Sequence, residues 1–225
     1  ERTAAGVVDC KKVLADTDGD IEKAVEELQK RGIAKAAKKQ GRIAAEGKVG
    51  LCALDNGKVC ALVELNCETD FVSKGDKFEA LYSAVAEQVA KTDSPTVDGV
   101  LADKFIGDQS ITVEQAITNF TAATGEKTTL RRVERYATES GRVGSYNHDG
   151  GRICVMVDIT ADPGVADGED FATMAEDVAM HVAAMNPSYV AAGEIPKEDI
   201  DKQKEIFTAQ VIEEGKPEKI APATK

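Results

Sequence analysis

The sequence predicts an α+β protein whose core consists of two related lobes with antiparallel sheets, flanked by helical segments at both ends. Three observations predict this class: an internal repeat that contains a β-hairpin, an amphipathic helix after each copy, and helical patterns before and after the repeat. The 225 residues are 42% hydrophobic and 30% charged, which is enough for one large or two small domains with real cores.

The internal repeat aligns residues 47–65 with residues 141–159 without a gap, at an offset of 94 residues (141 − 47). Seven of the nineteen aligned positions are identical: Gly47/Gly141, Val49/Val143, Gly50/Gly144, Asp55/Asp149, Gly57/Gly151, Cys60/Cys154 and Val63/Val157. Each copy predicts a β-hairpin, because glycine at a short turn separates two apolar runs. In the first hairpin, a two-residue turn at Asn56-Gly57 places Cys52 opposite Ala61.

An amphipathic helix is expected after each hairpin, over residues 76–90 and 170–185. The apolar stripe of the first helix contains Phe78, Leu81, Tyr82, Val85 and Val89. The stripe of the second contains Phe171, Met174, Ala175, Val178, Val182 and Met185, and this helix is expected to stop at Asn186-Pro187. Two α+β lobes are the simplest explanation of this arrangement.

The segments around the lobes have their own signals. Residues 4–32 predict two short helices that end at Gly32, and because two such helices cannot bury a core, a further helix is expected before them. Residues 34–46 form a basic linker, expected as a solvated helix face. Between the lobes, Thr112-x-x-Gln115 predicts a capping box, Gly125 ends that helix, and residues 129–138 predict a strand.

Two further expectations concern side-chain direction and the C-terminal part. Arg131 and Arg132 are adjacent in the strand 129–138, so they are expected on opposite faces. After Pro196 a polar helix with few apolar residues predicts an arm that projects from the core, and Gly215-Lys216-Pro217 predicts a hairpin tip.

Composition excludes several classes of function. The net charge of −12 argues against nucleic acid as a direct partner, and no apolar run is long enough for a membrane span. The five cysteines form no C-x-x-C pair and indicate reduced thiols in a cytoplasmic protein. Only two histidines are present, far apart, so neither a metal site nor a catalytic site is expected, and no cofactor.

The connection after residue 65 is the candidate functional feature. Asp70 and Phe71 lie between the most regular strand pattern and the clearest amphipathic helix, and a short connection held by two rigid elements can carry function at its tip. The alternative is that the Phe71 ring folds back into the core, as buried aromatic rings commonly do. The second copy has Thr-Ala-Asp-Pro-Gly at this place, and a feature that only packed the lobe would be expected in both copies.

Three strings, NCETDFV (66–72), GVVDCKKVLADTDGDIEKAVEEL (6–28) and HVAAMNP (181–187), resemble the translation elongation factor Ts family. The resemblance extends from Thr3 to about Ile220. It implies a guanine-nucleotide exchange factor that binds the GTPase elongation factor Tu with GDP bound, and promotes GDP release by disturbing the Mg²⁺ and phosphate site during translation elongation. It implies no nucleotide site in this chain itself.

The resemblance also implies a division of the chain. Residues 1–33 correspond to a helical domain like the ubiquitin-associated domain, with its first helix truncated. Residues 47–140 and 141–195 correspond to the N-terminal and C-terminal lobes of the core, and residues 196–225 to an incomplete coiled-coil arm.

The family pattern assigns partner-binding roles to three groups of residues. The exchange wedge consists of Asp70 and Phe71 with Thr69 and Val72. The N-terminal domain contributes Val7, Val8 and Lys11, and the C-terminal lobe contributes His148 and His181. Glu176 and Asp177 occupy positions at which some members carry basic residues.

Two other functions stay open on the residues alone. A thiol-dependent or metal enzyme would use Cys67 near Asp70, but its neighbours are acidic rather than cationic. An adaptor without exchange activity would use the small N-terminal helical domain as its main reader.

Overall fold

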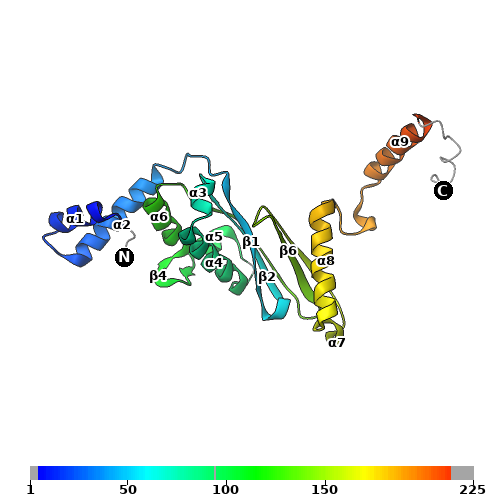
Figure 1. Cartoon of the computed structure of the whole chain (residues 1–225), viewed down its shortest axis with the longest axis horizontal. Helices are drawn as coiled ribbons and strands as arrows, with labels where there is room; N and C mark the ends of the chain where they lie inside the picture. The colour runs from blue at the N-terminus through cyan, green and yellow to red at the C-terminus, as the bar shows by residue number, and fades with distance from the viewer. Residues whose placement is uncertain (1–4, 94, 214–225) are drawn as a thin grey trace. The chain divides into compact units, whose positions relative to one another are not determined.

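The computed structural model describes residues 5–93 and 95–213, and these divide after Ala184 into two compact units. The first unit contains the N-terminal helices and both copies of the repeat, and the second begins at Met185. Figure 1 shows the elements in chain order. The mixture of helices with small antiparallel sheets confirms the predicted α+β class.

The N-terminal helices are α1 (Val7–Asp16) and α2 (Ile21–Ala37). The Asp20 carboxylate caps α2 by accepting a hydrogen bond from the Lys23 amide at 3.1 Å. The expected end of this helix at Gly32 is wrong, because α2 continues to Ala37. Gly32 is buried where α2 packs against α6, and a Cβ placed on it would lie 3.5 Å from the Ala122 Cβ, an ordinary van der Waals distance.

The first sheet has the order β1-β2-β5 and is antiparallel, with β1 (Glu46–Leu54), β2 (Val59–Cys67) and β5 (Thr129–Ala137). Cys52 pairs with Ala61, as the turn prediction required. Asn56 and Gly57 have φ of 53° and 80°, and positive values at both central residues are what a type I′ turn needs.

Helices cover one face of this sheet: α4 (Asp76–Lys91), α5 (Val97–Ala102) and α6 (Val113–Thr124), together with the short strands β3 (Lys104–Phe105) and β4 (Asp108–Thr112). The predicted stripe of α4 is buried in this core throughout. The Thr112–Gln115 capping box is present at the start of α6, and Gly125 ends that helix with a φ of 80°. The β3–β4 hairpin was not predicted, because Gly107 is its only strong turn signal.

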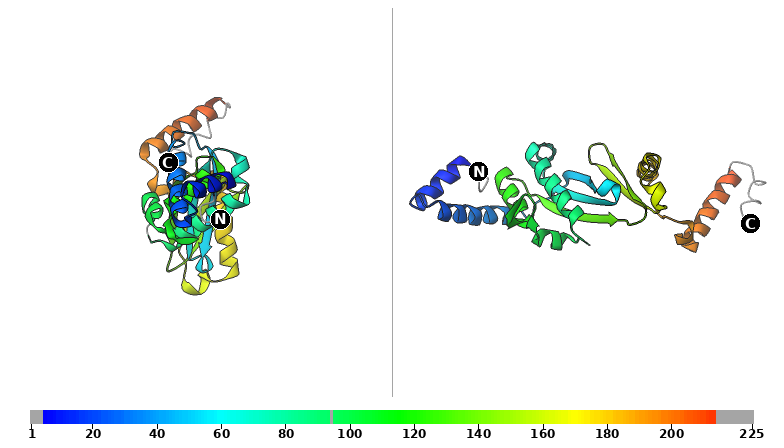
Figure 2. Two further views of the ribbon diagram at one scale, coloured as in Figure 1. Left: turned by 90° about the vertical axis from the view of Figure 1, so that its left-hand side faces the viewer. Right: turned by 90° about the horizontal axis from the view of Figure 1, so that it is seen from below.

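The second copy of the repeat forms the hairpin β6 (Arg142–His148) and β7 (Ile153–Ile159), followed by α7 (Pro163–Ala166) and α8 (Glu169–Met185), the helix drawn in yellow in Figure 2. Gly47 and Gly141, equivalent in the repeat, have φ of +135° and +138°. A Cβ on either would collide with a backbone oxygen of the paired strand. The predicted stripe of α8 is partly wrong: Met174 and Met185 are exposed, and Ala175 and Ala179 are the buried residues.

The hairpin β6–β7 lies against the other face of the first sheet (Figure 1), so β2 is buried on both sides. The Val49 amide donates a hydrogen bond to the Gly151 carbonyl at 2.9 Å, and the Cys154 thiol donates to the Val49 carbonyl at 3.3 Å. The expectation for Arg131 and Arg132 is wrong, because an irregularity at Glu64/Leu65 shifts the register with β5. Both guanidinium groups therefore reach the buried Glu64 carboxylate, at 2.9 and 2.6 Å.

The second unit contains η2 (Ala192–Glu194) and α9 (Lys197–Glu213). No residue of α9 is buried, which agrees with the predicted polar helix after Pro196. The hairpin tip expected at Gly215-Lys216-Pro217 lies outside the described residues. Within the described ranges, no helix is both long and apolar enough to cross a bilayer.

Candidate functional site

The site is the connection between β2 and α4, and its tip (residues 69–72) forms the start of the one-turn helix α3 (Asp70–Ser73). Thr69 is the N-cap, and its Oγ1 accepts a hydrogen bond from the Val72 amide at 3.4 Å. Capping by a threonine fixes the direction in which such a short helix begins. The strand before it is buried along most of its length, Val59 and Leu62 being half-buried, so the tip is carried by a well-packed element of the lobe.

The Phe71 side chain points into solvent, with 85% of its surface exposed. The alternative that this ring packs in the core of its own lobe is therefore wrong. Thr69 and Asp70 are exposed as well, whereas Val72 is half-buried and packs against the core cluster. An exposed phenylalanine beside a carboxylate, on a rigid support, has the composition of a protein-binding site.

The Asp70 carboxylate accepts a hydrogen bond from Lys74 Nζ at 2.7 Å, one helical turn further on. This bond, together with the lysine charge, holds the pKa of Asp70 below its ordinary value. Asp70 is therefore negatively charged at neutral pH.

Two carboxylates that the sequence analysis did not single out hold the base of the tip. Glu126 accepts hydrogen bonds from the Thr69 amide at 3.0 Å and from the Thr69 hydroxyl at 2.7 Å. Glu68 accepts from the Lys127 amide at 2.6 Å and from Arg42 Nη1 at 3.3 Å. Thr69 and Glu126 are 57 residues apart in the chain, so no local pattern pairs them.

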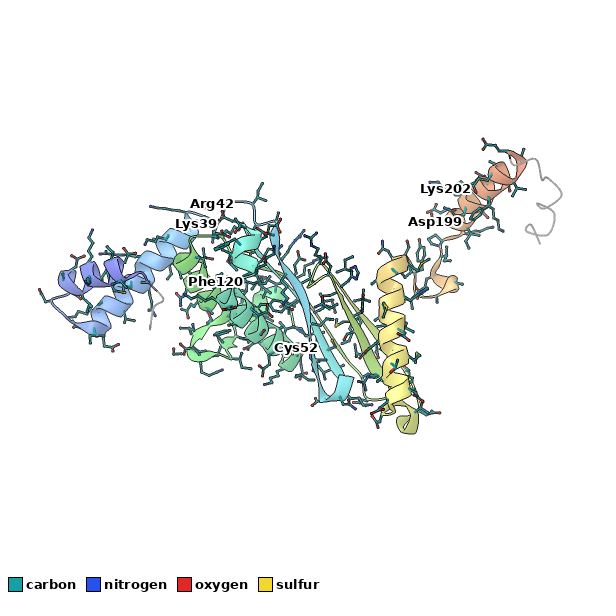
Figure 3. All side chains as sticks on the ribbon, in the orientation of Figure 1. Lys39, Arg42, Cys52, Phe120, Asp199 and Lys202 are labelled. Atoms are coloured by element: carbon teal, nitrogen blue, oxygen red, sulfur yellow. The ribbon has the colours of Figure 1, made fainter. Side chains whose placement is uncertain are left out.

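The basic linker contacts this same region. Lys39 Nζ donates to the Gly125 carbonyl, and Lys127 Nζ donates to the carbonyls of Gln40 and Arg42 at 2.6 and 3.0 Å. Figure 3 shows Lys39 and Arg42 on the segment that passes α3. The prediction of a solvated helix face is therefore wrong for Lys39 and Arg42, because α2 ends at Ala37 and both side chains donate hydrogen bonds to the lobe.

The N-terminal candidates lie on α1. Val7 and Val8 are 72% and 80% exposed, and Lys11 is exposed beside them, whereas Val13 is fully buried against α2. Exposure of both valines leaves an apolar surface on a small helical unit, as docking to another protein requires.

The two histidines are exposed on the second copy of the repeat. His148 ends β6, and its Nδ1 lies 3.0 Å from the Tyr146 hydroxyl. His181 lies on α8, on which Glu176 and Asp177 are also exposed. No hydrogen bond or ion pair among the described residues joins the histidines, the valines of α1 and the tip, so these are three separate surfaces.

The Cys67 thiol has no catalytic environment. It is fully buried, and burial raises its pKa to about 11, with the nearby Glu126 charge adding to the rise. A nucleophilic cysteine needs the opposite, a lowered pKa beside a cation or histidine. In the part of the chain that the structure describes, no group of three or more side chains is placed to hold a metal ion.

Comparison with known proteins agrees with the resemblance read from the sequence. The family model described as Elongation factor TS matches residues 68–224. An elongation factor Ts of Clostridium perfringens (strain SM101 / Type A) is 46% identical over 220 residues, which is 98% of this chain and 71% of the relative. Those of Clostridium botulinum (strain Eklund 17B / Type B) and Clostridium novyi (strain NT) are 44% and 43% identical over the same shares.

The fold, the exposed tip and these matches define a translation elongation factor that acts on another protein rather than on a substrate of its own. The chain belongs to the elongation factor Ts family. Elongation factor Ts is the nucleotide-exchange factor for elongation factor Tu, not a catalytic enzyme.

Proposed function

We propose that the Asp70–Phe71 tip carries the exchange activity, by entering the GTPase domain of elongation factor Tu and disturbing the Mg²⁺ and phosphate region of its GDP site. The observation that supports this most strongly is the 85% exposure of the Phe71 ring beside the charged Asp70. An exposed ring of this size has a large apolar surface to bury on a partner.

Weakening the binding of GDP takes binding free energy, and a large apolar anchor such as Phe71 can supply it. Exchange is a coupling between two binding events: a factor that weakens GDP binding by some ratio is itself bound more weakly by the same ratio when GDP is present. A thousandfold weakening corresponds to roughly 4 kcal/mol of differential binding. One central aromatic anchor supplies ~2 kcal/mol or more, so a single ring accounts for a large part.

The Asp70 charge has a separate role in this proposal. A GTPase holds its nucleotide through phosphate-cradling loops and a Mg²⁺ ion. A carboxylate brought near that region repels the phosphates and competes for the cation, which prefers oxygen ligands.

The remaining surfaces supply affinity. Val7, Val8 and Lys11 of α1 form a second contact with the GTPase domain, and His148 and His181 form a contact with another domain of elongation factor Tu. We keep the division into a ubiquitin-associated-like domain (1–33), a linker (34–46), two lobes (47–140 and 141–195) and an arm (196–225) as part of this proposal.

The test is Phe71→Ala in a fluorescent-GDP release assay with the cognate elongation factor Tu. The variant is expected to lower the maximal stimulated release rate at least tenfold, because the anchor is removed. Val165→Ala, which removes an apolar side chain 55% exposed on α7, is the matched control and is expected to change the rate less than twofold. An unchanged rate for a folded Phe71→Ala protein would remove the ring from the mechanism.

A further inference from the structure

The tip cannot hold its own geometry. The helix α3 has four residues, and a single isolated turn is unstable in water because few hydrogen bonds compensate for the ordered backbone. Three backbone bonds hold this turn: Ser73 N to Thr69 O at 3.3 Å, Lys74 N to Asp70 O at 3.1 Å and Gly75 N to Val72 O at 3.1 Å. Val72 packs against the core and anchors one side of this turn, but Phe71 and Asp70 are exposed, so their direction depends on further contacts.

Glu126 supplies this support from a different part of the chain. Its carboxylate accepts from both donors of Thr69, the amide at 3.0 Å and the hydroxyl at 2.7 Å. The hydroxyl has one proton, so while it donates to Glu126 its lone pairs face the Val72 amide. The resulting chain of bonds runs from Glu126 through Thr69 to Val72, and Phe71 lies between the last two.

The loop that carries Glu126 is itself firmly held. It follows Gly125, which ends α6, and the Glu126 amide donates to Thr124 Oγ1 at 3.3 Å. The Thr128 amide donates to the buried Thr121 hydroxyl at 3.2 Å. Because α6 is part of the core, these bonds connect the exposed tip to the rigid lobe.

A second carboxylate acts beside the first. Glu68, directly before the tip, accepts from the Lys127 amide at 2.6 Å, which lowers its pKa and keeps it charged. We call Glu68, Glu126 and Lys127 the latch. Their hydrogen bonds hold the chain on both sides of the point where β2 leaves the sheet.

We infer that Glu126 is a positioning residue for nucleotide exchange: by binding Thr69 it fixes the direction in which Phe71 and Asp70 leave the lobe. This inference rests on the proposed function of the tip. Glu126 itself touches neither nucleotide nor metal in this account, and it acts through Thr69 alone.

The experiment measures the maximal GDP-release rate and the half-saturating concentration of the full chain with elongation factor Tu. Glu126→Ala removes both acceptors and is expected to lower the maximal rate about fivefold to tenfold, with less than a twofold change in half-saturation. Glu126→Gln keeps one oxygen acceptor, and its maximal rate is expected to lie between those of wild type and Glu126→Ala. Glu114→Ala is the matched control, because Glu114 is an exposed carboxylate on α6 with no hydrogen bond or ion pair within the described ranges.

Two further readouts separate positioning from general loss of structure. Thr69→Ser keeps the hydroxyl and is expected to retain the wild-type rate. Thr69→Val removes the hydroxyl but keeps the amide bond to Glu126, so it is expected to lower the maximal rate with less than a twofold change in half-saturation. In a Phe71→Ala background, Glu126→Ala is expected to change the rate less than twofold, because the main group that Glu126 positions is gone and only Asp70 remains.

The outcomes are distinct. If Phe71→Ala lowers the rate and Glu126→Ala or Glu126→Gln lowers it only with Phe71 present, the inference stands. If Phe71→Ala lowers the rate but both Glu126 variants match wild type, or act equally in both backgrounds, the latch has no positioning role although the tip does. If Phe71→Ala itself has no effect, the proposed function fails, and the inference fails with it.

Discussion

At the scale of single residues, one buried carboxylate shows how local chemistry holds two strands together. The Glu64 side chain is 7% exposed and lies between Arg131 and Arg132, whose side chains are 63% and 72% exposed. Burial by itself would raise the pKa of Glu64, but the hydrogen bonds from Arg132 and Arg131 outweigh it, so the pKa lies below its ordinary value. This ion pair fixes the irregular pairing of β2 with β5.

Replacing Glu64 by Gln is expected to lower the free energy of unfolding by about 1–2 kcal/mol at pH 7, a buried-pair value discounted for the solvent around the arginines. A lowered folded pKa contributes stability above the unfolded pKa of about 4.3, and this is lost as the pH falls through the folded value. The variant should therefore lose less stability than wild type below about pH 4.3. Urea unfolding from pH 7 to pH 3 measures both effects.

Glu134→Gln is the control for this prediction, because Glu134 is exposed on β5, the strand of the two arginines, and its side chain has no hydrogen bond or ion pair among the described residues. Equal stability of wild type and Glu64→Gln at pH 7 would show that the ion pair contributes nothing.

The residue scale is also where sequence reasoning met its limit. The sequence alone predicts Phe71 and Asp70 as a functional feature, because it shows a large aromatic residue beside a carboxylate on a short connection. Glu126 was not identified, because its significance comes only from a contact with Thr69 across 57 residues. Strand alternation predicts opposite faces for Arg131 and Arg132, and no local residue pattern signals the register shift that brings both to Glu64.

At the scale of elements, the repeat explains why two of its glycines recur. Gly50 and Gly144 are equivalent, and each lies under the helix of its own lobe. A Cβ on Gly50 would collide with the Tyr82 hydroxyl of α4, and one on Gly144 with the Ala175 backbone of α8. In both lobes the glycine therefore allows helix and strand to approach closely.

Gly144→Ala is expected to lower the free energy of unfolding by about 1–3 kcal/mol, because the added methyl group must displace a backbone rather than a flexible side chain. Gly164→Ala is the control, since a Cβ there meets nothing within 4 Å. Thermal unfolding of the two variants gives the comparison. Identical melting temperatures would show that α8 does not pack on β6 at this point.

Elements with strong periodicity were predicted well. The hairpin register, the buried stripe of α4 and the capping box of α6 all follow from residue patterns. The end of α2 does not follow from the local pattern: Gly32 usually signals a helix stop, but α2 continues to Ala37 and packs against α6. Tertiary packing overrides local propensity in such cases.

At the scale of the whole molecule, nucleotide exchange needs two contributions: affinity for elongation factor Tu, and displacement of the bound GDP. The N-terminal valines and the tip occupy separate elements of the first unit, and no described bond joins them. If α1 provides affinity and the tip provides displacement, the two contributions are separable in kinetics.

Val7→Ser together with Val8→Ser is expected to raise the half-saturating concentration for exchange about tenfold, at an unchanged maximal rate, since apolar contact area is lost. Titration of the factor in the GDP-release assay measures both parameters. A complete loss of binding, with the lobes alone inactive, would instead favour an adaptor in which the N-terminal helices are the main reader.

The central claim is that Phe71 couples binding of this chain to release of GDP. The most direct measurement is the affinity of the chain for elongation factor Tu with and without saturating GDP, for wild type and Phe71→Ala. Wild type should bind nucleotide-free elongation factor Tu about a thousandfold more tightly than the GDP complex, and the ratio should fall at least tenfold in Phe71→Ala. A ratio that stays the same in the variant would contradict the account.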